Sequence, residues 1–137
     1  MRKLLTFIYF FSTLSVVFAQ QPDSLPTHPL IGTWTIQEQR LDGGSTHLND
    51  CEKQSTYIFT TDEIIENYYK NYKGNCVVLN TNKDKYTLQG NRIIRRDEPE
   101  LNNTFYIRDN ILTLTFSGKD EDGNKHIAII ILKKTNP

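Results

Sequence analysis

Apolar and polar residues alternate along most of the chain after residue 30, in short segments separated by turn residues. Alternation with a period of two is typical of β-strands that bury one face, and no segment convincingly indicates a helix. Breakers such as Asp42-Gly43-Gly44 end the segments. The pattern predicts eight strands, over residues 32–41, 54–60, 64–72, 76–88, 92–96, 103–107, 111–116 and 125–133.

The connections between these strands alternate in length. Three are short and fall near residues 61–63, 89–91 and 108–110. In an antiparallel up-and-down arrangement, alternate connections lie at opposite ends of the sheet. We therefore expect an all-β fold, a single eight-stranded antiparallel β-barrel that tight turns close at one end. An eight-stranded barrel is either filled by side chains or holds one small ligand. Four longer polar connections would frame the other end, at residues 42–53, 73–75, 97–102 and 117–123.

The only tryptophan, Trp34, lies in the first predicted strand and shares a face with Ile36. Gly32, two residues earlier, has no Cβ and lets the backbone pass close to a large ring. We interpret Gly32 and Trp34 as a structural plug of the core at the closed end, in preference to a ligand contact.

The N-terminus has the features of a secretory signal peptide over residues 1–19. Basic residues at positions 2 and 3 precede an apolar run, and Val17 and Ala19 place small residues before the cleavage site. The apolar run is roughly 15 residues, short of the roughly 20 that a membrane-spanning helix needs. We therefore expect an exported protein, periplasmic or secreted, with a flexible lead-in over residues 20–29 and a barrel domain over residues 30–137.

Export would place Cys51 and Cys76 in an oxidising compartment, where two cysteines in a small domain usually pair. A disulfide closing a loop of roughly 25 residues would stabilise the fold by about 3.5 kcal/mol in the chain-entropy model. A reactive or metal-binding thiol is the alternative, but no C-x-x-C spacing or neighbouring histidine supports it.

Charge and motifs exclude several classes of function. The chain has 16 basic and 16 acidic residues, without a basic stripe for nucleic acid. After residue 19 no segment is long and apolar enough to make an integral membrane protein. There is no nucleophile elbow, H-E-x-x-H motif or phosphate loop, and His28, His47 and His126 are scattered. The sequence predicts no enzyme, no cofactor and no metal site.

Gly32-Thr33-Trp34 resembles the G-x-W motif of lipocalins, in the calycin superfamily. The chain as a whole is similar to the lipocalin-like domains of exported proteins in Bacteroidetes-type bacteria. The T-D-Y motif is absent, and Lys133 and Lys134 stand where many lipocalins have an arginine that stacks on the tryptophan. The resemblance implies a lipocalin-like barrel. Further matching segments are residues 30–31, 50–53, 57–59, 86–91 and 111–114, together with Cys76.

Aromatic side chains on alternating positions suit a small, mostly apolar ligand, although they would equally well fill the barrel. Glu38 and Arg40 continue the face of Trp34. Inside the barrel they would indicate a polar ligand group, whereas a twist or bulge would turn them to water. The candidate ligand-lining residues are Glu38, Arg40, Tyr57, Phe59, Tyr68, Tyr86, Phe105 and Phe116.

These observations favour a non-enzymatic barrel that binds a small hydrophobic or amphipathic molecule at the long-loop end. An alternative is a filled barrel that contacts another protein, or a second copy, through its loops or the last strand. Both faces of residues 125–133 are apolar, which fits such a contact. A third hypothesis is a hydrolase or isomerase with Glu38 or a tyrosine as its acid or base.

Overall fold

The computed structural model describes residues 27–135, so the predicted signal peptide and most of the lead-in lie outside the described residues. All eight predicted strands are present, and their order confirms the antiparallel up-and-down barrel. A short strand, β2 (Gly44–Thr46), and a 3-10 helix, η1 (Glu52–Gln54), lie in a stretch expected to be loop. The eight barrel strands are β1 (Gly32–Leu41), β3 (Thr56–Phe59), β4 (Glu63–Tyr72), β5 (Asn75–Gln89), β6 (Arg92–Arg95), β7 (Asn102–Arg108), β8 (Ile111–Lys119) and β9 (Lys125–Lys134).

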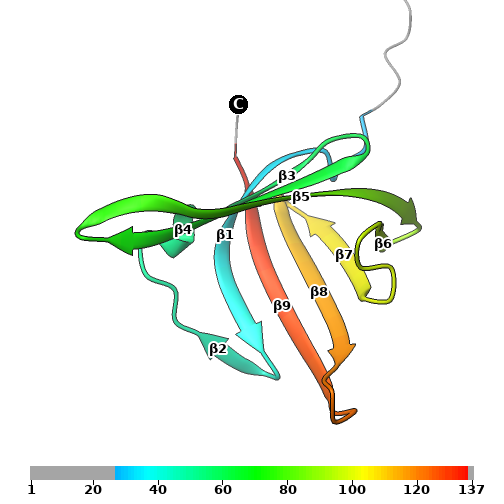
Figure 1. Ribbon diagram of the computed structural model, residues 1–137. Helices are drawn as coiled ribbons and strands as arrows, with labels where there is room; N and C mark the ends of the chain where they lie inside the picture. Colours follow the sequence, from blue (N-terminus) through cyan, green and yellow to red (C-terminus); the bar gives the residue numbers. More distant parts are fainter. Residues whose placement is uncertain (1–26, 136–137) are drawn as a thin grey trace, which may run out of the picture.

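Pairing of the first strand with the last closes the barrel. β1 and β9 pair from Trp34 opposite Lys134 to Leu41 opposite Ala128. In Figure 1, β3, β4 and β5 run across the direction of β1, β9 and β8, as strong twist in a closed sheet requires. Because β8 and β9 are four strands away from β4 and β5 in the ring, these pairs of strands face each other across the interior.

One connection differs from the expectation. The prediction of a longer connection at residues 73–75, between β4 and β5, is wrong, because Lys73 and Gly74 alone form a turn with φ values of 50° and 83°. Positive φ at both central residues is the mark of a tight hairpin turn. β5 then runs without a break through the polar stretch at residues 80–84, and the β4–β5 hairpin extends well beyond the rest of the barrel in Figure 1.

The hydrophobic core lies toward the end that the tight turns close. Trp34 is fully buried there, and its Nε1 donates a hydrogen bond to the Leu30 carbonyl at 2.8 Å. On β9, Ile130 and Leu132 face this core, so the opposite face of that strand, with Ile127, points outward. The other buried apolar side chains of the cluster are Leu30, Ile36, Tyr57, Phe59, Ile64, Tyr86, Ile93, Leu112 and Leu114.

Lys134 covers the outside of the tryptophan. Its Nζ lies 5.1 Å from the Trp34 ring centroid and donates to the Pro29 carbonyl at 3.2 Å. A lysine thus makes the cation–π contact for which many lipocalins use an arginine. Gly32 lies beside this lysine, with a φ of 137°, and a Cβ there would stand only 2.9 Å from Lys134 Cε. The backbone therefore passes close to the lysine that covers the ring.

Gly32→Ala should lower the free energy of unfolding by about 2–3 kcal/mol, because it combines backbone strain with displacement of the Lys134 side chain. Gly74→Ala is the matched control: its φ is 83°, but nothing lies within 4 Å of the added Cβ. The control should lose only about 1–2 kcal/mol. Urea denaturation of both variants measures the difference. Equal losses of unfolding free energy would show that displacing the Lys134 side chain does not destabilise the protein.

The predicted disulfide is confirmed. Cys51 and Cys76 are bonded, with their Cα atoms 5.2 Å apart. Cys51 is buried next to η1, and Cys76 is the second residue of β5. The bond therefore joins the long connection after β1 to the β4–β5 hairpin.

None of the helices within residues 27–135 has the length and apolar character needed to cross a membrane.

Candidate functional site

The barrel interior holds two adjacent spaces. One, here called the cup, has a volume of about 310 Å³ and opens at the end away from Trp34. The other, here called the floor cavity, is about 10 Å³ and lies deeper. Four residues line both spaces, namely Tyr57, Glu66, Arg95 and Phe116. The cup also contacts Tyr68, Asn82, Glu98 and Ile130, and the floor cavity Phe59, Ile64, Ile93, Asn103 and Leu114.

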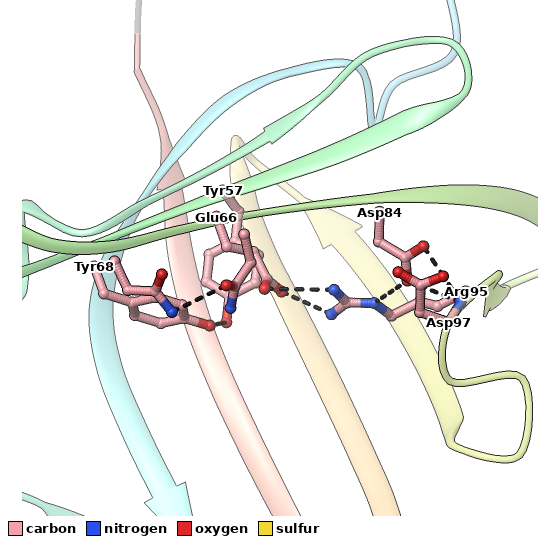
Figure 2. Close-up of polar contacts among 8 residues, drawn as sticks. Tyr57, Glu66, Tyr68, Asp84, Arg95 and Asp97 are labelled. Atoms are coloured by element: carbon pink, nitrogen blue, oxygen red, sulfur yellow. Dashed lines mark hydrogen bonds and ion pairs between the residues drawn. The ribbon is translucent and has the colours of Figure 1, made fainter.

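A row of buried polar side chains crosses one wall of the interior, as Figure 2 shows. Arg95 donates to Glu66 through Nη1 at 2.7 Å and through Nη2 at 3.4 Å. Its Nε donates to Asp84 Oδ2 at 3.2 Å, and the backbone N–H of Asp97 donates to the same carboxylate. The hydroxyls of Tyr57 and Tyr68 lie 3.1 Å apart at the other end of the row. These five side chains are here called the polar row.

Strand alternation and register place the polar row. Glu66 shares a face of β4 with buried Ile64, and Asp84 shares a face of β5 with buried Tyr86. In the ladders, Tyr57 pairs with Glu66, and Ile64 pairs with Asp84. Cross-strand neighbours on one face lie close enough to interact. The row therefore follows from which residues face inward and from the pairing of β3 to β6.

The polar row contains three charged groups, the guanidinium of Arg95 and the carboxylates of Glu66 and Asp84. Burial opposes the positive charge of Arg95, but hydrogen bonds and charge from Glu66 and Asp84 outweigh it and raise the pKa of the guanidinium. One cation between two carboxylates leaves a net charge of minus one. Their side chains are only 5–11% exposed. A buried charge that is paired and hydrogen-bonded is tolerated, whereas an unpaired one is costly.

The two tyrosines remain neutral. Burial, followed by the charges of neighbouring groups, raises the pKa of Tyr57. The pKa of Tyr68 is raised by burial and by the nearby carboxylate of Glu66. Both hydroxyls therefore keep their protons and can donate as well as accept hydrogen bonds near neutral pH.

The wall that faces the polar row is apolar. Phe116 and Leu114 come from β8, and Ile130 comes from β9. A molecule in the cup would meet hydroxyl and charged groups on one side and hydrocarbon on the other. This arrangement suits an amphipathic molecule.

The structure brings some of the predicted lining residues together and separates others. Tyr57, Phe59, Tyr68 and Phe116 line the cup or the floor cavity. Tyr86 packs edge-on against Phe59, with ring centroids 5.8 Å apart. Its hydroxyl donates a hydrogen bond to the Thr60 carbonyl near the closed end.

Phe105, also a predicted lining residue, contacts His28 of the lead-in. Their ring centroids lie 5.9 Å apart in an edge-on arrangement. Phe105 packs against the core cluster and is not among the residues that line the cup or the floor cavity.

Glu38 and Arg40 lie outside the interior group. The register of β1 with β9 shifts between Ile36 and Glu38, which is a bulge. Past it, Arg40 donates to Glu38 at 2.6 Å, and the side chains are 45% and 37% exposed. The hydrogen bond from Arg40 lowers the pKa of the Glu38 carboxyl. The bulge was one of the two arrangements that the sequence left open.

Sequence reasoning missed Glu66, Asp84, Arg95 and Asn103. The alternation that identified the inward-facing aromatic residues could also have identified these four. Glu66 is two residues before Tyr68, and Asn103 is two residues before Phe105. Their polarity argued against an inward position, although burial is acceptable where charges pair.

A second cluster lies at the surface, where the turn after β1 meets the loop between β8 and β9. The His126 ring lies between two carboxylates, with Nδ1 at 2.7 Å from Asp42 and Nε2 at 2.9 Å from Asp120. Hydrogen bonds to Asp42 and Asp120 raise the pKa of His126. Hydrogen bonds from His126 and Asn124 lower the pKa of Asp120 to about 2. Within residues 27–135, no group of three or more such side chains is arranged to hold a metal ion.

The stability that this cluster contributes should depend on pH in a defined direction. The pKa of His126 is higher in the folded state than its ordinary value of about 6.5. Its contribution to the free energy of unfolding is therefore complete below about pH 6.5 and is lost as pH rises through the folded-state pKa. The Asp120 contribution is present above about pH 4 and is lost toward about pH 2.

We expect His126→Gln to remove the alkaline part of this dependence. Between about pH 6 and about pH 8, the free energy of unfolding should fall more in the unmodified protein than in the variant. Urea denaturation at the two pH values measures both changes. Parallel pH profiles for the two proteins would contradict the assignment.

Comparison with known proteins identifies a family. The family described as the lipocalin-like domain matches residues 30–136. No curated protein in the comparison is similar to the chain.

Several solved structures resemble the chain. An odorant-binding protein from bovine nasal mucosa is 15% identical, with a TM-score of 0.46, and the match covers 79% of this chain and 72% of that one. Aphrodisin, a sex pheromone from female hamster, is 19% identical, with a TM-score of 0.43 and coverages of 78% and 76%. A dog lipocalin allergen is 15% identical, with a TM-score of 0.43 and coverages of 77% and 74%.

Proposed function

We propose that this protein, which belongs to the lipocalin-like domain family, binds a small hydrophobic or amphipathic molecule in the cup. The observation that carries the proposal is a space of about 310 Å³ between a polar wall and an apolar wall at the open end. Ligand sites are typically concave and mostly apolar, with a few convergent polar groups. Tyr57, Tyr68 and Arg95 supply those groups, and Phe116 and Ile130 supply the apolar surface.

We further propose that the protein acts after export and binds without catalysing a reaction. The signal-peptide features of residues 1–19 and the Cys51–Cys76 bond support export. The residues of the cup support binding, since Arg95 and Glu66 bond to each other and the tyrosines remain protonated.

Tyr68→Ala tests the proposal, because Tyr68 lines the cup. The protein should bind the neutral fluorescent probe N-phenyl-1-naphthylamine, and the variant should bind it about tenfold more weakly after losing an aromatic contact. Fluorescence titration gives both dissociation constants. Tyr106→Ala is the matched control, since Tyr106 is 64% exposed, and it should bind as the unmodified protein does.

Failure of the unmodified protein to bind the probe would count against the proposal. Equal weakening by Tyr68→Ala and Tyr106→Ala would place the probe somewhere other than the cup. Circular dichroism of each variant would verify that the barrel still folds.

A second function, protein binding, is favoured by one specific observation. The β4–β5 hairpin extends from the barrel and exposes Tyr72, Val77, Val78 and Leu79. Contiguous exposed apolar residues often mark interaction sites. If this hairpin binds another protein or a second copy of the chain, the double substitution Val78→Lys/Leu79→Lys should abolish that association and leave probe binding intact. Analytical ultracentrifugation measures the association.

A further inference from the structure

The floor cavity contains an unusual polar group, the side-chain amide of Asn103. Asn103 is 2% exposed and lines this cavity. Neither its Oδ1 nor its Nδ2 has a hydrogen-bond partner among the described residues. Buried polar side chains nearly always have partners, because an unsatisfied one has lost its hydrogen bonds to water without replacement. We therefore expect the Asn103 amide to form hydrogen bonds with a molecule that enters the cavity.

The amide restricts what that partner is. Oδ1 accepts hydrogen bonds and Nδ2 donates them, so a group that satisfies both atoms must donate and accept. The cavity volume of about 10 Å³ is close to the space that one water-sized atom needs. A hydroxyl oxygen meets both conditions, whereas an ammonium only donates and a carboxylate only accepts.

Charge around the cavity adds a second restriction. Glu66 and Arg95 line it directly, and Asp84 bonds to the same arginine, so this group carries a net charge of minus one. Glu98 adds another negative charge at the cup. A ligand carboxylate would face this excess of negative charge at low dielectric and would be repelled.

We infer that Asn103 determines specificity by binding the hydroxyl group of a neutral amphipathic alcohol or phenol whose apolar part occupies the cup. This inference rests on the proposed function and adds the chemical class of the ligand. The hydroxyl reaches the floor cavity, and the hydrocarbon lies against Phe116 and Ile130. A bound water molecule is the competing partner of Asn103.

Three ligands of matched shape separate these alternatives, namely 2-naphthol, naphthalene and 2-naphthoate. Each is titrated against the protein loaded with N-phenyl-1-naphthylamine, and probe fluorescence reports displacement. One additional satisfied hydrogen-bonding group should make 2-naphthol bind about tenfold more tightly than naphthalene. The carboxylate 2-naphthoate should bind most weakly of the three.

Asn103→Leu keeps a similar side-chain volume and removes both polar atoms. In this variant the advantage of 2-naphthol over naphthalene should fall to about twofold or less, while naphthalene binds at least as tightly as before. Nuclear magnetic resonance of the unmodified protein gives a readout that needs no variant. 2-Naphthol should shift the side-chain amide signals of Asn103, and naphthalene should leave them nearly unchanged.

Equal affinities for 2-naphthol and naphthalene, or unshifted Asn103 amide signals, would overturn the inference and leave a structural water as the partner of Asn103. In that result the proposed function would stand, because the ligands still bind. Absence of binding by the probe and all three ligands would overturn both.

Discussion

Loss of the Cys51–Cys76 disulfide should lower the free energy of unfolding by about 3.5 kcal/mol. The bond joins residues 25 positions apart and removes the corresponding freedom from the unfolded chain. It also links η1 to the hairpin that extends from the barrel. The double variant Cys51→Ala/Cys76→Ala removes the bond without leaving a lone thiol, and urea denaturation measures the loss.

Reduction provides the control for this prediction. Dithiothreitol should destabilise the unmodified protein by the same amount and leave the double variant unchanged. A loss below about 1 kcal/mol would mean that the unfolded chain is already compact near these residues.

Arg95→Met should lower the free energy of unfolding by about 3 kcal/mol near neutral pH. The variant keeps the length of the side chain but leaves Glu66 and Asp84 buried together without their cation. Breaking a buried ion pair by removing one partner costs about 3–5 kcal/mol, and we expect the lower end because the cup is open to solvent. Urea denaturation at constant pH measures the change.

An exposed ion pair and a double variant provide the controls. Arg40→Met removes the partner of Glu38 at the surface and should cost at most about 1 kcal/mol. Adding Glu66→Gln to Arg95→Met should restore part of the loss, because one unpaired charge disappears. Losses that simply add would show that Arg95 and Glu66 are not energetically coupled.

Alternation identified the strands because one face of each strand packs on the core. This signal is local, so it located all eight strands without knowledge of their partners. The alternation is interrupted at residues 80–84, which are all polar. Pairing with β4 holds β5 together there, since the ladder runs from Tyr72 opposite Asn75 to Glu63 opposite Lys85. Tertiary pairing overrode the local sequence preference.

The site was less accessible to sequence reasoning because it depends on pairing between strands. Alternation alone puts Glu66 and Arg95 on inward faces, but their charges favour water unless they meet. They meet because β4, β5 and β6 pair in one register, and this register is not visible in a single sequence. Glu38 and Arg40 show the opposite effect, since one bulge removed them from an inward face.

Native mass spectrometry of the protein purified from its natural host tests the central claim most directly. If the cup binds a small molecule, the folded protein should carry a reproducible additional mass that denaturation releases, and fragmentation of that species would identify an alcohol or phenol. A bare monomer mass in every preparation would contradict the binding function. A dimer or a complex with another protein, without a small molecule, would instead support the β4–β5 hairpin as an interaction surface.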